Sequence, residues 1–216
     1  MKKLLLFLIF LFIGIVLGSS YYVWKSNQTN NNIVRVKKEP RFSINNAPKN
    51  SEKGTIQSMI GTIKWESRIA TQASQITKPV PIQQGEAVIT GEDASAVIYY
   101  QSGLTISLTP NAHLSFVQML PTNFVLNQLK GTIEYQKDNS IPLAIRSLHL
   151  LTQISDGDVL IAVDPATASV SITVTQGSVK LAFNDSQKIS NVINLNTGDQ
   201  YLFDDEKRQG NLKTSY

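Results

Sequence analysis

From Gly54 onward, the chain is built of short runs in which apolar and polar side chains alternate. Residues 104–108 and 170–174 alternate strictly, and residues 179–183 do so with Ala182 as the small member of the apolar set. Side chains on a β-strand point to opposite faces in turn, so a period of two indicates strands that bury one face. Helical periodicity is nearly absent from this part of the chain. The sequence therefore predicts an all-β domain.

Glycines separate the predicted strands, and most of them are followed closely by another β-rich run. We interpret seven as structural turn glycines: Gly85, Gly91, Gly103, Gly131, Gly157, Gly177 and Gly198. The sharpest case is Gly103, which separates two runs as a hairpin turn with positive φ would. Two architectures fit this pattern, an antiparallel β sandwich and a solenoid-like stack of short strands. The irregular glycine spacing does not choose between them.

The first 24 residues are typical of a transmembrane signal anchor. Two lysines precede an uninterrupted apolar run over residues 4–17, and aromatic side chains cluster at residues 21–24. As a helix, about 20 such residues rise about 30 Å, which matches the hydrocarbon core of a bilayer. A cleaved signal peptide is the alternative, because the small residues at 18–20 fit a cleavage site. We therefore expect one N-terminal transmembrane helix and a lipid bilayer as partner.

Composition and charge divide the chain after the predicted anchor into three parts. Residues 25–53 are predicted to form a flexible basic stalk, residues 54–210 the β domain and residues 211–216 a short tail. Lys and Arg outnumber acidic residues nine to two in residues 1–53, whereas residues 54–216 hold 11 basic and 14 acidic residues. The domain thus lacks the cationic surface that a nucleic-acid backbone requires. No nucleic-acid partner is expected.

No group of residues in the sequence has the pattern of a catalytic or metal site. The chain has no cysteine, which excludes disulfides, thiolate metal sites and a cysteine nucleophile. His113 and His149 lie in separate β runs without zinc-ligand spacing, and no Gly-x-Ser-x-Gly elbow marks a serine nucleophile. The acidic stretch 156–158 precedes a hydrophobic run, so we interpret it as a turn rather than a calcium loop. We expect no cofactor, no metal and no enzymatic activity.

Aromatic side chains offer one candidate binding surface. Tyr99 and Tyr100 are adjacent on one predicted strand and therefore point to opposite faces. The outward one, together with Phe116, Phe124 or Tyr135, is a candidate for a sugar-binding or protein-binding patch, or covers a sheet edge. The strand register decides which of these aromatic residues reach the surface.

Residues 85–103 resemble the hallmark stretch of FecR-type domains. In that family a Gly-Asp pair and an Ile-x-Thr-Gly motif precede a Ser-x-Ala strand and an Asp-Gly turn. This chain has Glu86 in place of the aspartate and Gln101-Ser102-Gly103 in place of the Asp-Gly turn. The likeness covers about residues 54–205 and continues through Leu129-Lys130-Gly131-Thr132-Ile133, Gly157-Asp158, Thr175-Gln176-Gly177-Ser178-Val179 and Gly198-Asp199. The family's second motif usually has a Gly-Thr pair where this chain has Ser155-Asp156-Gly157-Asp158.

This resemblance implies an extracytoplasmic β domain on a bacterial inner-membrane protein, with the N-terminus in the cytoplasm. Family members known for signalling carry a cytoplasmic segment that binds a sigma factor, whereas only three residues precede the apolar run here. Sigma-factor control is therefore not expected, and the outer module remains. We expect a non-catalytic binding or sensing module of the cell envelope that engages a protein partner. The alternative is a structural envelope protein that attaches a surface polymer or assembly. The sequence does not indicate an oligomeric state.

Overall fold

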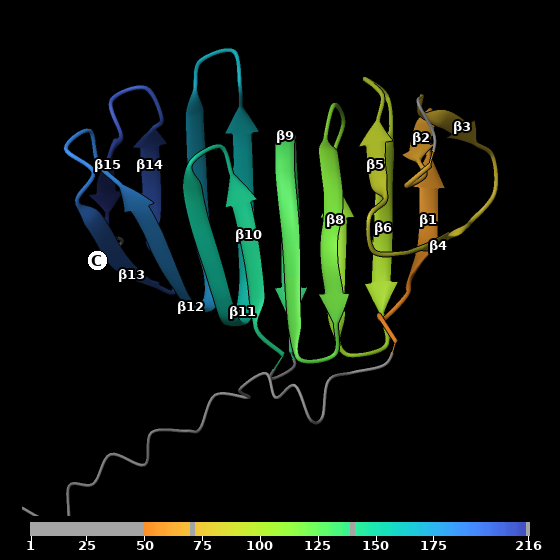
Figure 1. Cartoon of the computed structure of the whole chain (residues 1–216), viewed down its shortest axis with the longest axis horizontal. Helices are drawn as coiled ribbons and strands as arrows, with labels where there is room; N and C mark the ends of the chain where they lie inside the picture. The colour runs from red at the N-terminus through yellow and green to blue at the C-terminus, as the bar shows by residue number, and fades with distance from the viewer. Residues whose placement is uncertain (1–49, 70–71, 139–140, 215–216) are drawn as a thin grey trace, which may run out of the picture. The chain divides into compact units, whose positions relative to one another are not determined.

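The computed structural model describes residues 50–69, 72–138 and 141–214 (Figure 1). Within these ranges the chain has fifteen strands and no helix, so the all-β prediction is confirmed. The predicted anchor over residues 1–24 and most of the predicted stalk lie outside the described residues. No described helix is long and apolar enough to cross a membrane.

The strands follow one another with short connections. They are β1 (Gly54–Ile60), β2 (Ile63–Glu66), β3 (Ser74–Ile76), β4 (Pro81–Ile82), β5 (Ala87–Thr90), β6 (Ser95–Tyr100), β7 (Leu104–Leu108), β8 (His113–Leu120), β9 (Asn123–Lys137), β10 (Leu143–Ser147), β11 (Leu150–Asp164), β12 (Ser169–Asn184), β13 (Ser190–Asn196), β14 (Gln200–Asp204) and β15 (Gln209–Lys213). The last strand ends at Lys213, three residues past the predicted end of the β domain at residue 210.

All fifteen strands belong to one hydrogen-bonded sheet that folds into two facing layers (Figure 1). The first layer has the order β4-β1-β6-β7-β9-β11-β12-β14-β15. The second layer has the order β3-β2-β5-β8-β9-β10-β11-β12-β13. Three long strands, β9, β11 and β12, therefore belong to both layers. The pairing of β9 with β10 is parallel, and the other pairings are antiparallel.

The long strands change layers by bending. The N-terminal half of β9 pairs with β8 and β10, and its C-terminal half, from Gly131 on, pairs with β7 and β11. The paired strands β11 and β12 bend together at residues 155–158 and 176–178, with register shifts on both sides. We call the side of the domain where β11 and β12 bend the bend edge. The architecture thus combines the two layers of a sandwich with the continuous winding of a stack.

Three of the glycines predicted to lie in turns are inside strands. Gly131, Gly157 and Gly177 all have positive φ, but they lie in β9, β11 and β12 and bend a strand that continues through them. A layer change needs the same left-handed backbone as a turn, which glycine adopts without steric cost. Gly103 does lie in the β6–β7 hairpin, with φ of +87°. Gly91 is not among the glycines with positive φ.

Gly85 and Gly198 are each the third residue of a four-residue turn that ends at an acidic residue. Glu86 is 6% exposed, and its Oε2 accepts a 2.8 Å hydrogen bond from the backbone nitrogen of Gln83. Asp199, also 6% exposed, accepts a 2.8 Å bond from the backbone nitrogen of Asn196 in the same three-residue relation. The acid of each Gly-acid pair therefore satisfies a backbone donor ahead of a strand. A glutamate accepts the backbone hydrogen bond in the first turn and an aspartate accepts it in the second.

The core lies between the two layers and consists of the apolar members of the alternating runs. Leu104, Ile106 and Leu108 are buried, and the threonine and serine between them are half-buried. Among the buried polar side chains of the described residues, Gln128 lies where β9 changes layers and is fully buried. Its Nε2 donates to the carbonyl oxygens of Gly131 at 2.8 Å and Ile161 at 2.9 Å. The hydroxyl of Tyr135 donates to its Oε1 at 3.0 Å.

Candidate functional site

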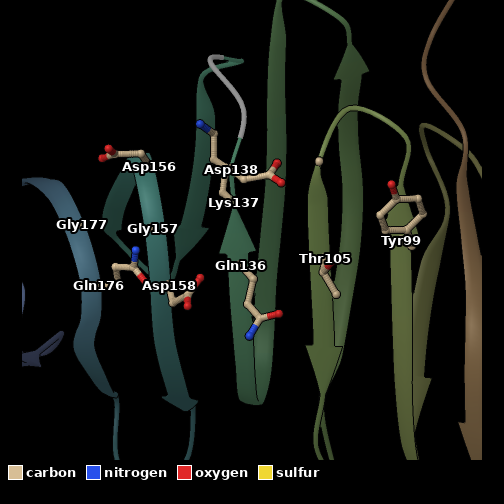
Figure 2. Close-up of a pocket in the computed structure, with 11 residues that line it drawn as sticks. Tyr99, Thr105, Gln136, Lys137, Asp138, Asp156, Gly157, Asp158, Gln176 and Gly177 are labelled. Atoms are coloured by element: carbon tan, nitrogen blue, oxygen red, sulfur yellow. The ribbon is translucent and has the colours of Figure 1, made fainter.

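A groove of about 550 Å³ opens on the outer face of the first layer, at the bend edge (Figure 2). Its lining comes from β6, the β6–β7 turn, β7, the end of β9 and the bent parts of β11 and β12. These segments span 79 residues of sequence, from Tyr99 to Gly177. Only the folding of the sheet brings them together.

The floor of the groove is one cross-strand row of five side chains. Tyr99 pairs with Thr105, Thr105 with Gln136, Gln136 with Asp158 and Asp158 with Gln176. Directly paired residues on neighbouring strands share a face, so the five side chains project outward together. The row offers an aromatic ring, a hydroxyl, two amides and a carboxylate (Figure 2). It can therefore stack on a ligand and both donate and accept hydrogen bonds.

Carboxylates dominate the charge of the groove. Asp138 and Asp156 are exposed on the rim, and Asp158 is half-buried in the floor. The cation of the lining, Lys137, is 3% exposed, and its Nζ donates to the backbone carbonyl of Ser155. Because that ammonium is turned into the protein, the surface of the groove is acidic. It favours a ligand that carries positive charge or hydroxyl donors.

The chain enters the domain beside this groove. The backbone nitrogen of Glu52 donates to the carbonyl of Met119 at 2.7 Å, and its Oε1 accepts a 2.9 Å bond from the backbone nitrogen of Ser102. Ser102 immediately precedes Gly103 of the groove lining. Glu52, which is predicted to belong to the stalk, is thus held against the bend edge.

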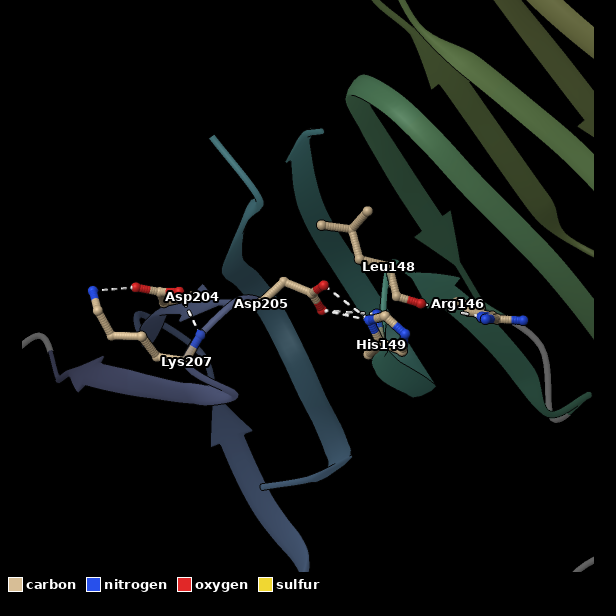
Figure 3. A network of polar contacts seen from close by, with 6 residues as sticks. All are labelled: Arg146, Leu148, His149, Asp204, Asp205 and Lys207. Atoms are coloured by element: carbon tan, nitrogen blue, oxygen red, sulfur yellow. Dashed lines mark hydrogen bonds and ion pairs between the residues drawn. The ribbon is translucent and has the colours of Figure 1, made fainter. Parts of the chain in front are cut away.

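The two histidines lie away from the groove. His113 begins β8 and is half-buried, and this burial lowers the pKa of its imidazole while Glu66 acts in the opposite direction. His149 lies before β11, where its Nδ1 is 2.8 Å from Asp205 Oδ2 and its backbone nitrogen donates to Asp205 Oδ1 (Figure 3). This pair links the β10–β11 turn to the β14–β15 turn. We therefore assign a structural role to the contact between His149 and Asp205.

The carboxylate of Asp204 is engaged locally. Asp204 accepts from Lys207, both from its backbone nitrogen at 2.9 Å and from its Nζ at 2.6 Å (Figure 3). These bonds hold the pKa of the Asp204 carboxyl below its usual value. In the described ranges, no three His, Asp or Glu side chains are arranged to hold a metal ion.

The predicted aromatic patch is wrong in most of its members. Tyr99 is the outward tyrosine, at 36% exposure, and Tyr100 is fully buried. Phe116, Phe124 and Tyr135 are buried in the core as well. Tyr100 packs against both phenylalanines, with ring centroids 6.3 and 5.7 Å apart. Of the aromatic residues predicted for this patch, Tyr99 is the one that reaches the surface, and its neighbours in the groove are polar.

Comparison with known proteins gives a likeness of fold. No protein-family model matches the chain, and no curated protein matches it. Two crystal structures of a "putative anti-sigma factor" from Parabacteroides distasonis, at 1.65 and 2.50 Å resolution, match with TM-scores of 0.52. Their sequence identity is 10% and 11%, over 60% of this chain. This chain spans 59% of the length of those structures. The likeness therefore concerns the β architecture alone.

Proposed function

We propose that this chain is a membrane-anchored, extracytoplasmic binding or sensing module without catalytic activity, and that the groove receives a segment of an envelope protein. The observation that carries the proposal is the outward row of Tyr99, Thr105, Gln136, Asp158 and Gln176. Five strands, fixed by the bends of the sheet, present this row as one preorganised surface. Binding residues on rigid strands need little reordering when a ligand binds.

The chemistry of the groove favours an extended basic segment as its ligand. Three carboxylates line the groove, and the ammonium of Lys137 is engaged with the backbone of Ser155. A lysine or arginine side chain of the partner would therefore meet complementary charge in the groove. Tyr99 offers a ring face on which a guanidinium or an aromatic side chain stacks. The two glutamine amides suit the backbone of an extended peptide.

Glu52 lies beside the groove, because its backbone and side chain are hydrogen-bonded at the bend edge. The likeness to anti-sigma factor structures supports a regulatory role for such a fold, and the partner we propose is an envelope protein rather than a sigma factor.

Site-specific photo-cross-linking tests the groove. A photo-reactive amino acid replacing Gln136, in the full chain in its native membrane, is expected to give one discrete protein adduct. The same replacement at Val117, which is 51% exposed on the second layer, is the control and is expected to give none. Asp158→Asn in the Gln136 background should weaken the adduct, because it removes a charge without changing shape. Equal labelling at both sites, or no loss with Asp158→Asn, would rule out the groove as the binding surface.

Reporter fusions test the topology. A reporter fused after residue 60 is expected to be active only if it requires export, because the apolar run over residues 4–17 is proposed to anchor the chain with its N-terminus in the cytoplasm. Fusions of an export-dependent phosphatase and of a fluorescent protein that matures only in the cytoplasm make the comparison. Fluorescence without phosphatase activity would reverse the proposed orientation.

A second candidate function is attachment of a surface polymer, and the composition of the groove floor favours it. An exposed tyrosine with amides, a hydroxyl and a carboxylate on the floor of the groove also suits the rings and hydroxyls of a polysaccharide. The cross-linking experiment separates the two functions. A protein partner gives a discrete band, whereas a polymer gives a broad smear that a glycan-degrading enzyme removes.

A further inference from the structure

We propose that the chain pairs with a second copy of itself through the free edge of β13, in an antiparallel arrangement related by a two-fold axis. The proposal is independent of the groove, because β13 belongs to the second layer and the groove to the first. It rests on the contrast between the two ends of the sheet, on the side chains that β13 exposes, and on the self-complementarity of its sequence.

The two ends of the sheet differ in how their edges are protected. At one end, β3 has three residues and β4 has two, and prolines at positions 79 and 81 interrupt hydrogen bonding there. At the other end, the edge strand β15 has five residues and ends in Lys213, whereas the edge strand β13 has seven residues and contains neither a proline nor a charged side chain. Natural proteins block exposed edges with short strands, prolines and charges, because an open edge recruits another strand. Among the strands that the structure describes, β12 is the one partner of β13, so the other edge of β13 carries no strand.

An apolar row leads to this unprotected edge. Leu151 pairs with Ala182 across β11 and β12, and Ala182 pairs with Val192 of β13. Leu151 is 44% exposed and Val192 is 62% exposed. On the inner face, Ile193 pairs with the fully buried Leu181 but is itself only partly buried. A strand added beside β13 would continue the outer apolar row next to Val192 and cover the exposed side of Ile193.

The sequence of β13 is compatible with itself in antiparallel pairing. If the two-fold axis passes through Ile193, the two copies of Ile193 meet on the inner face. On the outer face Val192 lies opposite Asn194 of the other copy, and Ser190 opposite Asn196. No like charges meet, because β13 is uncharged. A two-fold interface uses the same patch twice and closes on itself, so it ends in a dimer rather than a filament.

Cysteine cross-linking tests the pairing, and the absence of native cysteine makes the background clean. In the full chain in membranes, Ile193→Cys is expected to form a disulfide-linked dimer on mild oxidation. Directly opposed residues in an antiparallel pair have the Cα separation that a disulfide needs. The yield should fall from Ile193→Cys to Ser190→Cys and Asn196→Cys. Val117→Cys, an exposed valine in the middle of the second layer, is the control and should give several-fold less dimer.

A charged edge provides the second test. Val192→Lys is expected to convert the detergent-solubilised dimer to monomer, as measured by its mass in solution, whereas Val117→Lys should leave the dimer intact. A wild-type monomer, equal cross-linking at Val117→Cys, or a β13 adduct whose mass shows a different protein would each overturn the proposal. The last result would assign the edge to a different partner.

Discussion

Replacing Gly157 with alanine is expected to lower the free energy of unfolding by about 3 kcal/mol or more, through backbone strain and a backbone clash. Gly157 has φ of +100°, where an L-residue is strained. A Cβ at this position would lie 2.0 Å from the carbonyl oxygen of Gln176 and 2.6 Å from its carbonyl carbon. Both atoms belong to the backbone of β12, so relief requires separating the paired strands at the layer change. Chemical unfolding followed by circular dichroism measures the loss.

Gly103→Ala is the matched control, because Gly103 also has positive φ but a different neighbour. Its added Cβ would meet the carboxylate of Asp138, the far end of an exposed and flexible side chain. The loss should therefore be confined to backbone strain, about 1 kcal/mol. If the two variants lose equal stability, the paired backbone at Gly157 is not what makes that position intolerant.

Gln128→Leu is expected to cost about 2 to 4 kcal/mol of stability, because it leaves buried polar groups without partners. The substitution removes the donor to the carbonyls of Gly131 and Ile161 and the acceptor of the Tyr135 hydroxyl. Gln128 and Tyr135 are both fully buried, and burial raises the pKa of Tyr135 well above its ordinary value. Neither water nor ionisation can take over the lost bonds. Denaturant titration again measures the effect.

A double-mutant cycle tests whether the cost comes from unpaired groups rather than from lost volume. Tyr135→Phe alone should cost about 1 kcal/mol, since it leaves only the Gln128 carbonyl oxygen unpaired. In the Gln128→Leu background the same change should be neutral or stabilising, because it removes an orphaned hydroxyl. Additive losses in the double variant would mean that the two side chains act independently, contrary to the bond between them.

The alternation of the sequence predicted the buried face of the strands correctly, and the glycines were harder to interpret. Period-two runs such as residues 104–108 bury the side chains that the pattern indicates, because solvent exclusion acts on each face separately. A glycine with positive φ serves equally for a turn and for a strand that changes layers. The sequence therefore could not reveal that Gly131, Gly157 and Gly177 lie inside long strands.

The groove could not have been found from the sequence. Thr105, Gln136 and Asp158 are ordinary residues of separate strands, and only the register of four neighbouring pairings aligns them with Tyr99 and Gln176. The aromatic residues failed as a guide for a similar reason. Phe116 and Phe124 occupy inward positions of their strands, where large apolar rings contribute most to burial.

The three strands shared by both layers have a consequence for how the chain folds. Neither layer can be completed before the other, because β9, β11 and β12 must pair on both sides of their bends. Residue pairs such as Ser107 with Glu134 and Glu134 with Leu160 bring distant parts of the chain together at each step. Long-range pairing of this kind slows folding, since loop closure precedes any gain from contacts. We therefore expect the domain to fold slowly, and to gain and lose its structure as one cooperative unit.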